Sequence, residues 1–561
     1  MPHRSITSRP FRHRRGTVLV IVLVVVMMLA LAGYRFTESM VTERNAASLL
    51  TRGLQSRLAA ESGVEMFAAL LDLRTSNLSE PLNLFSNPSL FQSVPVNQAS
   101  SSYAQCRFSL VTDDGQNTLG QAVRFGVVNE SSRLDLNSLV SLLDEEARDR
   151  LLALPGMTIE TADAILDWID EDETPRQYGA ENEYYGTLSP PYSAANQRPA
   201  SVDELLSVRG VTPLLLYGED ANVNGLLDPS ENDGEMSLPW DNGDGFLDSG
   251  WAAYLTAYSA ELLLQIDGSP PIDFNGDDLQ TLFDELSAAF DADVATFVTA
   301  LRMFGPSSQG GSGSGSGSSR QSGGGASGGR SGGGVSGPGS GGQSSGALGS
   351  AGQRGGSQSS NGRNQNVFDL SRAPSYDITS LYELIDSSVQ VVMNNRQQTL
   401  QSPWTSESSD LSGALPDMLD KLKTTSSTSQ PGRIDIRTAS REVLLTVPDI
   451  DPQLVELIVG RQTELTLAGV GTDTVDLLAT TGWLLQEGHV DRAEMQRLDP
   501  YLTARGDVFR VQSIGGFDTS GPYVRLEAVV DGSQVPARII SVRDLTAVGR
   551  GYLPELMFGH Q

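Results

Sequence analysis

An uncharged apolar run near the N-terminus constrains this chain more than any other feature. Residues 17–33 read TVLVIVLVVVMMLALAG. As a helix this run is about 25 Å long, close to the lower limit for crossing a bilayer. Five arginines and no acidic residue precede it, and a basic flank places that end of a membrane helix in the cytoplasm. A cleaved secretory signal has a similar pattern, but no small-residue cleavage site ends the run and the helical pattern continues.

The helical pattern persists well beyond the apolar run. Leucines recur at 50, 54 and 58, and apolar residues then follow at Val64, Phe67 and Leu71. This spacing is typical of an amphipathic helix, and no proline interrupts residues 11–80. The sequence therefore predicts one long N-terminal helix that spans a membrane over residues 17–36 and is amphipathic over residues 37–80.

Charge and composition exclude several classes of protein. With 561 residues, the chain is long enough for three or four domains. It has 39 basic and 69 acidic residues and a net charge of −30, which repels phosphate backbones and disfavours nucleic-acid binding. One cysteine and four histidines leave little for a thiolate cluster, a zinc site or a histidine-based triad. No nucleophile–base pair or phosphate-binding loop is evident, so we do not expect an enzyme.

Two groups of β-strand patterns lie far apart in the chain. The runs CRFSLVTDD (106–114) and AVRFGVVNE (122–130) are separated by turn residues and predict a hairpin. Three further runs lie at 507–516, 523–533 and 537–545. We therefore expect a first β segment at 100–134, a C-terminal β segment at 505–561, and an α+β fold with a small antiparallel sheet.

The region between the β segments is expected to be helical. Residues 151–170 match a helix-hairpin-helix unit with Pro155-Gly156 at the turn, because glycine permits the tight path between the helices. Residues 444–462 form a related unit with Asp449 in the glycine position, and residues 204–216 a shorter one. We expect a large inserted α-helical domain at 135–306 and a second helix-hairpin-helix region at 367–504, both of the SAM-like kind.

Helix-hairpin-helix units suggest a second function class. In DNA-repair proteins these turns present backbone N–H groups to a phosphate, with cationic residues beside them. The residues that flank the first turn here are acidic, namely Glu160, Asp163, Asp167 and Asp170. A membrane-anchored DNA-binding or uptake protein is therefore an alternative that the charge of the chain opposes.

The sequence DANVNGLLDPSE (220–231) fits the twelve-residue calcium loop D-x-[DN]-x-[DN]-G-x5-E at every specified position. Gly225 permits the sharp turn. Seven oxygens at this spacing suit Ca²⁺ better than the smaller shell of Mg²⁺. A solvated acidic turn is the alternative. The expected ligands are Asp220, Asn222, Asn224, Leu226 through its carbonyl, Asp228 and Glu231.

A second acidic sequence, DNGDGFLD (241–248), fits the calcium pattern only in part. With Gly245 in the glycine position, tryptophans occupy the first and last ligand positions. Asn242, Asp244 and Asp248 remain as weaker metal candidates.

Residues 307–366 consist almost entirely of glycine, serine, glutamine, asparagine and arginine. Such a composition cannot bury enough apolar area to offset its ordering entropy. We expect a disordered insert.

The N-terminus resembles a type IV prepilin. Its basic leader, residues 1–16, ends in Arg15-Gly16 directly before the apolar run. The resemblance implies cleavage between Gly16 and Thr17 by a prepilin peptidase. Pilins mostly carry a glutamate at the fifth mature position, where this chain has Ile21. The absence of that glutamate is characteristic of the protein K family of minor pseudopilins.

Four sequences in order carry the resemblance to the type II secretion system protein K family. They are DLNSL (135–139), LPGMTIETADAILDWIDEDETPRQYGAENEYY (154–185), PPYSAANQRPASVDELLSVRGVTP (190–213) and IDIRTASREVLLTVPDIDP (434–452). The resemblance implies calcium binding and a minor pseudopilin that caps or initiates a pseudopilus for export of folded proteins across the outer membrane. The implied partners are I-, J- and H-like minor pseudopilins, the major pseudopilin, the prepilin peptidase and the inner-membrane platform. The implied location is the inner membrane, with a single span, a cytoplasmic N-terminus and a periplasmic head.

Overall fold

The computed structural model describes most of the chain outside the glycine- and serine-rich segment. The described residues are 15–76, 83–96, 105–113, 123–234, 236, 241–307, 368–393, 396–406, 411–468, 480–517 and 521–558. Most of the expected leader and nearly all of the expected disordered insert therefore lie outside the described residues. The chain divides into two compact units: residues 1–276, 377–386 and 402–561 form the first, and residues 277–376 and 387–401 form the second.

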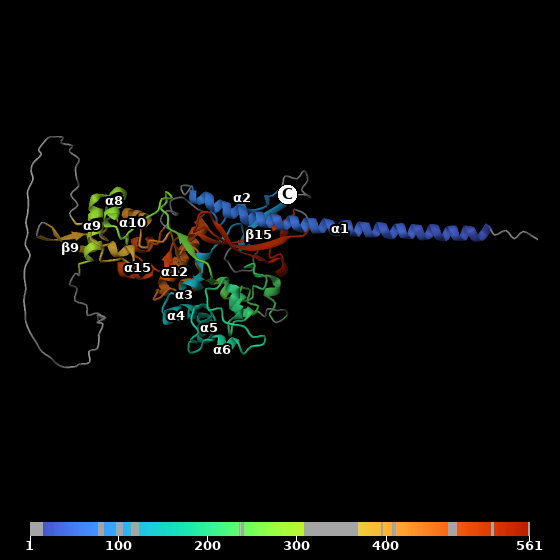
Figure 1. Ribbon diagram of the computed structural model, residues 1–561, viewed down its shortest axis with the longest axis horizontal. Coiled ribbons are helices and arrows are strands. Elements are labelled where there is room, and N and C mark those ends of the chain that lie inside the picture. The colour runs from blue at the N-terminus through green and yellow to red at the C-terminus, as the bar shows by residue number, and fades with distance from the viewer. Residues whose placement is uncertain are drawn as a thin grey trace, which may run out of the picture. The chain divides into compact units, whose positions relative to one another are not determined.

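The first helix, α1 (Arg15–Ser76), is continuous over 62 residues, as the sequence predicts. It is long and apolar enough over Thr17–Leu73 to cross a membrane, by length and composition. Its two halves have different surroundings. Large apolar side chains from Val18 to Phe36 are exposed, whereas Val64, Phe67 and Leu71 are buried. Figure 1 shows α1 passing along strand β15 and extending beyond the sheet.

The sheet of the first unit combines strands from both ends of the chain. Its strand order is β1-β2-β15-β16-β17, all antiparallel, with β3 beside β2 and β4 beside β15. The strands are β1 (Val94–Pro95), β2 (Cys106–Asp113), β3 (Val123–Arg124), β4 (Val128–Asn129), β15 (Val508–Phe517), β16 (Val524–Asp531) and β17 (Arg538–Asp544). The expected C-terminal strand group is confirmed.

One strand expectation is wrong in detail. Residues 122–130 do not form a single strand, because the chain bends between β3 and β4. Gly126 packs against the backbone of Phe85, where a side chain would clash, and Val127 N–H donates to the Leu84 carbonyl at 3.1 Å. The close approach of residues 84–85 therefore interrupts the strand, and only its first part completes the hairpin with β2.

Helix α1 lies directly on this sheet. Ser513 Oγ donates to the Ala60 carbonyl at 2.8 Å, and Cys106 Sγ donates to the Gln55 carbonyl at 3.4 Å. A side chain at Gly515 would overlap the α1 backbone, with Ala60 N only 2.6 Å from its Cβ. Phe67 packs edge-on against Phe509 at 5.7 Å between ring centroids. One core therefore joins α1, β2, β15 and the C-terminal helix α16 (Pro554–Phe558).

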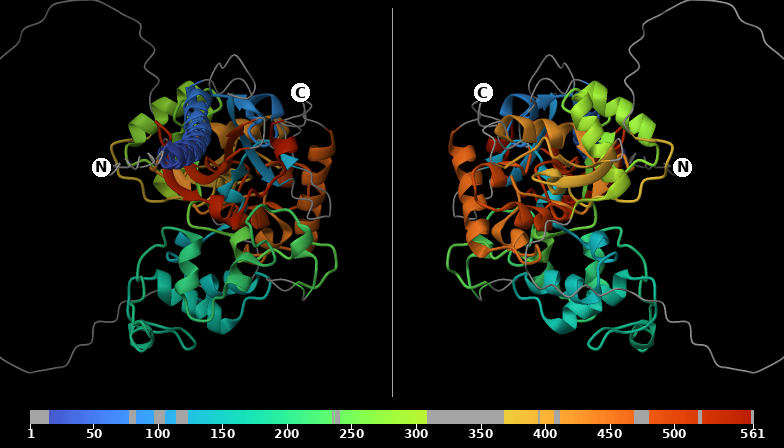
Figure 2. Two further views of the ribbon diagram at one scale, coloured as in Figure 1. Left: turned by 90° about the vertical axis from the view of Figure 1, so that its right-hand side faces the viewer. Right: turned by 90° about the vertical axis from the view of Figure 1, so that its left-hand side faces the viewer.

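A helical region follows β4 and has its own core. Its elements are β5 (Leu134–Asp135), α3 (Leu136–Leu139), α4 (Asp144–Leu152), α5 (Ile159–Ile169), α6 (Asn182–Tyr185), the 3₁₀ helix Val202–Ser207 and α7 (Pro213–Tyr217). Its core includes Leu134, Leu151, Ile165, Trp168 and Trp251. Figure 2 shows this region, drawn in teal, grouped beside the sheet.

The first unit also contains further helices and short strands. Four short strand pairs are β5 with β6 (Leu255–Thr256), β7 (Ala260–Leu262) with β12 (Ser429–Pro431), β8 (Ile272–Asp273) with β11 (Leu422–Lys423), and β13 (Ile434–Asp435) with β14 (Leu502–Thr503). The helices are α2 (Pro88–Phe91), α10 (Leu411–Lys421), α11 (Arg441–Leu444), α12 (Pro452–Ala468), α14 (Trp483–Gln486) and α15 (Arg492–Leu498).

The described part of the second unit contains two helices and a hairpin. The helices are α8 (Leu279–Ala289) and α9 (Ala292–Phe304), and the antiparallel strands are β9 (Ser388–Met393) and β10 (Arg396–Gln401). Asp278 and Asp291 cap the two helices through their side chains.

The turns of the three expected helix-hairpin-helix units share one backbone feature. Gly156, Gly210 and Asp449 all have positive φ, at 67°, 85° and 55°. Each residue precedes a helix, namely α5, α7 or α12. Asp449 therefore adopts the left-handed conformation of the glycine it replaces, which aspartate tolerates better than most residues. The assignment of these turns to the helix-hairpin-helix or SAM-like class stays a prediction.

Candidate metal centre

The predicted calcium loop, residues 220–231, is a compact turn held by its own side chains. Asp220 accepts hydrogen bonds from the backbone N–H groups of Asn224 and Gly225, each at 2.9 Å. Gly225 has φ 71°, the left-handed conformation for which the motif requires glycine. A hydrogen bond therefore joins the first and sixth positions of the motif.

The last position of the loop folds back onto its start. Glu231 is 2% exposed. Its two carboxylate oxygens accept from Ala221 N–H and Asp228 N–H, each at 3.0 Å. Burial, together with the charges of Asp220 and Asp228, raises the pKa of Glu231 to about 7. The negative charges of Asp220 and Asp228 therefore act on Glu231, and this repulsion would fall on binding a cation.

The two asparagines also point toward these carboxylates. Asn222 Nδ2 and Asn224 Nδ2 donate to Asp228 Oδ2 at 2.6 and 3.0 Å. Asn222 Oδ1 is buried and receives no hydrogen bond from any residue of the described parts of the chain. An amide oxygen of this kind is a ligand that hard cations prefer. The side chains of all five predicted side-chain ligands therefore belong to one cluster, and Leu226 lies within the same turn.

The loop is attached to the sheet through its backbone. Arg525 on β16 is fully buried and donates to the carbonyls of Asn222, at 2.7 Å, and Val223. Tyr552 Oη donates to the Asn224 carbonyl at 2.9 Å. A cavity of about 400 Å³ lies next to the loop, with Asp220 and Asn224 in its lining. The loop therefore connects the helical region to the sheet and borders this cavity.

The weaker candidates, Asn242, Asp244 and Asp248, lie in a second turn nearby. Asn242 Nδ2 donates to Asp248 Oδ2 at 3.0 Å, and Asp244 Oδ1 accepts from Phe246 N–H at 2.8 Å. The sequence analysis missed Glu219, which is 5% exposed. Its carboxylate accepts from Asp248 N–H at 3.1 Å, and burial raises its pKa. Its position beside the first loop residue, Asp220, was the available signal.

The acidic residues beside the first helix-hairpin-helix turn have partners within the protein. Asp163 is fully buried and pairs with Arg148 at 2.5 Å. Asp167 is also fully buried and pairs with Arg176 at 2.8 Å. These carboxylates therefore bind the two arginines and hold α5 to the segments around it. They contribute to packing in this region.

These features together define a class of protein: an N-terminal helix fit to span a membrane, carrying an α+β head in which a helical region interrupts one antiparallel sheet. Residues 132–217, which lie in the helical region, match the family model described as type II secretion system (T2SS), protein K. This segment of the chain is therefore similar to the protein K family.

Curated relatives match over a short segment. The type II secretion system protein K of Aeromonas hydrophila is 50% identical over 58 residues, which is 10% of this chain and 18% of that protein. The protein K of Pectobacterium carotovorum subsp. carotovorum is 48% identical over 48 residues, 9% of this chain and 15% of that protein. The aligned segments thus cover less than a fifth of either relative.

A solved structure also matches at low similarity. It is the GspK-GspI-GspJ complex of the type 2 secretion system from enterotoxigenic Escherichia coli, with a TM-score of 0.33 and 10% identity over 90% of this chain and 99% of that chain.

Proposed function

We propose that this chain is a minor pseudopilin of a type II protein secretion system, and that it caps or initiates the pseudopilus tip. The observation that carries the proposal is the protein K match over residues 132–217. That segment lies between β4 and β15, two paired strands of one sheet. In this proposal the helical region is an insertion that enlarges the head, and a large head above the helix blocks the addition of further subunits.

The surface of α1 supports assembly with other helices. Leu50, Leu54 and Leu58 are 72, 64 and 59% exposed, although they lie beyond the apolar run. Their spacing places them on one face of the helix, apart from the residues that pack on the sheet. An exposed apolar stripe of this kind favours contact with a partner helix. The partners in this proposal are I-, J- and H-like minor pseudopilins and the major pseudopilin, at the inner-membrane platform, with the head in the periplasm.

Co-purification tests this assembly. The full chain is expressed with the I- and J-like minor pseudopilins of the same organism, extracted in detergent and purified through a tag. We expect a stable complex that Leu54→Glu weakens. Gln55→Glu is the matched control, because it adds the same charge to the next exposed position, on another side of the helix. A well-folded chain that binds neither partner would contradict the proposal.

Processing of the N-terminus is a further part of the proposal. A prepilin peptidase cuts between Gly16 and Thr17, which leaves the apolar run at the start of the mature chain. Co-expression with the peptidase should shorten the chain by sixteen residues, as measured by intact mass. Gly16→Leu should leave the leader in place, and an unchanged mass for the native chain would exclude this step.

Calcium binding at residues 220–231 completes the proposal, with Asn242, Asp244 and Asp248 as candidates for a further ion. The charges of Asp220 and Asp228 that act on Glu231, together with the unpartnered Asn222 oxygen, support it. Calcium should raise the melting temperature relative to chelator. Glu231→Gln should reduce this rise, and Glu160→Gln, at an exposed helix position, should not. Equal rises in melting temperature in both variants would contradict a calcium site at residues 220–231.

A further inference from the structure

The hairpin of the second unit has an outer strand whose far edge is open. In the described parts of the chain, β10 pairs with β9 alone. All six residues of β10 pair without a register shift, and all are exposed except Leu400, which is half-buried. Figure 1 shows the hairpin beside α9, under the label β9. A strand edge of this kind presents a row of unpaired backbone N–H and C=O groups.

Hairpin geometry identifies which backbone groups of β10 face outward. Met393 and Arg396 are paired, with two residues between them in the sequence. In a two-residue hairpin the pair that flanks the loop exchanges both backbone hydrogen bonds, and hydrogen-bonded pairs then alternate along the ladder. Arg396 and every second residue after it therefore direct their backbone groups to β9. The backbone groups of Gln397, Thr399 and Gln401 point away from β9.

The features that protect the edges of the large sheet are missing from β10. Natural edge strands are short, bend at bulges, or carry proline and charged side chains. Strand β1 has two residues and contains Pro95. Strand β17 shifts register and carries Arg538, Arg543 and Asp544. Strand β10, with the sequence RQQTLQ, is six residues long and has one charged residue, Arg396. The chain therefore leaves this edge open to another strand.

The helical layer behind the hairpin ends at β9. Val389 and Val391 of β9 are 0 and 1% exposed, and α9 packs on this strand. Leu400 and Gln398, their cross-strand neighbours on β10, are half-buried and exposed. Strand β10 therefore extends past the helices. A strand added beside it would meet exposed backbone without displacing packed side chains.

The side chains around this edge suit an uncharged strand. On the face turned away from the helices, Gln397 Nε2 donates to Gln390 Oε1 at 2.6 Å, and Val392 is 71% exposed. Glutamine and threonine both donate and accept hydrogen bonds, and β-branched side chains pack well across strands. A partner strand of threonine and valine residues therefore matches both the polar and the apolar positions.

We propose that β10 binds an extended segment of another polypeptide by strand addition, which makes the hairpin a three-stranded sheet. The outward backbone groups of Gln397, Thr399 and Gln401 hold the segment. The segment is uncharged where it pairs and basic at its ends, because β10 has no carboxylate and the chain carries a net charge of −30, which attracts cations. The same charge opposes pairing between two copies of this chain. This proposal does not depend on the secretion function.

A synthetic peptide tests strand addition. The probe is a dye-labelled strand of alternating threonine and valine with a lysine at each end. Its binding to the full chain in detergent is followed by fluorescence anisotropy, and we expect saturable binding. A second probe has the same sequence but a methyl group on every backbone nitrogen of the strand. It keeps the side chains and the charge but has no backbone N–H to donate, so it should not bind.

A matched pair of variants locates the binding edge. Thr399→Pro removes an outward N–H and leaves the hydrogen bonds to β9 in place, because proline is tolerated at an edge position whose N–H faces solvent. It should weaken binding of the first probe at least about fivefold, the effect of losing one backbone hydrogen bond. Thr399→Ala keeps the N–H and is the control, for which we expect the affinity of the native chain.

Three outcomes would overturn the proposal. Equal binding of the two probes would mean that the lysines alone attract the peptide to an acidic chain. Binding that Thr399→Pro leaves unchanged would place the peptide at another surface. Sedimentation that reveals dimers of the native chain, lost in Thr399→Pro, would make a second copy the partner. Should Thr399→Pro fail to fold, the comparison of the two probes decides, because it needs no variant.

Discussion

The buried carboxyl group of Asp135 leads to a prediction about how stability depends on pH. Asp135 is 3% exposed and caps α3 by accepting from Asn137 N–H at 2.9 Å. Burial raises its pKa from 3.8 to about 7; the charge of Glu130 acts in the same direction, and hydrogen bonds and Arg198 act against it. The native protein therefore holds a proton on this residue in a range of pH where the unfolded chain has lost it.

The direction in which stability changes with pH follows from proton binding. Between pH 3.8 and about 7 the native state binds one more proton than the unfolded state, so the contribution of Asp135 to the free energy of unfolding falls as pH rises. A shift of about three pKa units corresponds to at most about 4 kcal/mol. The full contribution of Asp135 to stability is present below the pKa of its carboxyl group in the unfolded chain. It is lost once the pH exceeds the pKa of the same group in the folded protein.

Asp135→Asn isolates this effect. Asparagine caps a helix about as well as aspartate and does not titrate. The difference in unfolding free energy between variant and native chain should be small near about pH 4 and should favour the variant by up to about 4 kcal/mol near pH 8. All other titrating groups are common to both proteins and cancel in this difference.

Denaturation by urea at several pH values measures the difference. The fluorescence of Trp168 and Trp251 reports on the core that also contains Leu134 and Leu136. Asp149→Asn, at an exposed position, is the control and should give a difference that does not change with pH. A flat curve for Asp135→Asn, or a variant that is less stable than the native chain near pH 8, would refute the reasoning.

Three substitutions test the packing of the sheet. Gly515→Val should lower stability by about 1–3 kcal/mol, because its side chain overlaps the α1 backbone. In calorimetry the control Gly413→Ala, whose added methyl group meets no neighbour, should not lower stability. Equal effects of the two variants would contradict the close contact between Gly515 and α1. Phe67→Ala should cost about 3–5 kcal/mol, since Phe67 is fully buried; a loss below about 1 kcal/mol would count against this core. Arg510 binds Glu130 at 2.7 Å. Arg510→Met should therefore cost about 3–5 kcal/mol of stability, because Glu130 loses this positively charged partner. The double variant that also carries Glu130→Gln should recover part of that loss.

Local patterns in the sequence were enough to predict several features. The apolar run and the spacing of Val64, Phe67 and Leu71 predicted a continuous helix and its buried face, because helical periodicity depends only on residues three or four apart. The glycine at 156 and the aspartate at 449 marked turns that need positive φ. The ligands predicted from the calcium pattern also lie in one turn, since all of them fall within twelve residues.

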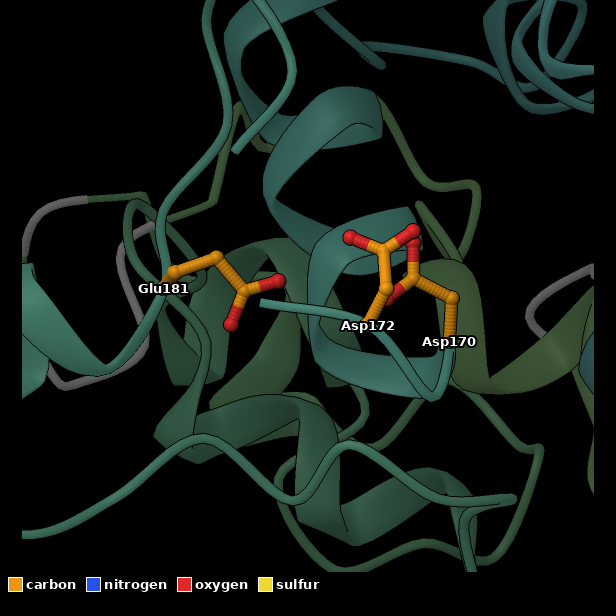
Figure 3. A group of neighbouring side chains, drawn as sticks. All are labelled: Asp170, Asp172 and Glu181. Carbon is orange, nitrogen blue, oxygen red and sulfur yellow. The ribbon is translucent and has the colours of Figure 1, made fainter. Parts of the chain in front are cut away.

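Only the tertiary structure decided which distant segments meet. Strand pairing has no local signature of its partner, so the sequence did not indicate that β2 lies beside β15. The bend at Gly126 arises from the backbone of Phe85, which no periodicity reveals. Nothing in the local sequence indicates that the fold buries Glu181 next to Asp170 (Figure 3). The sequence thus determined the elements and their apolar faces, and long-range packing determined their pairing and the burial of charge, because both depend on contacts between residues far apart in the chain.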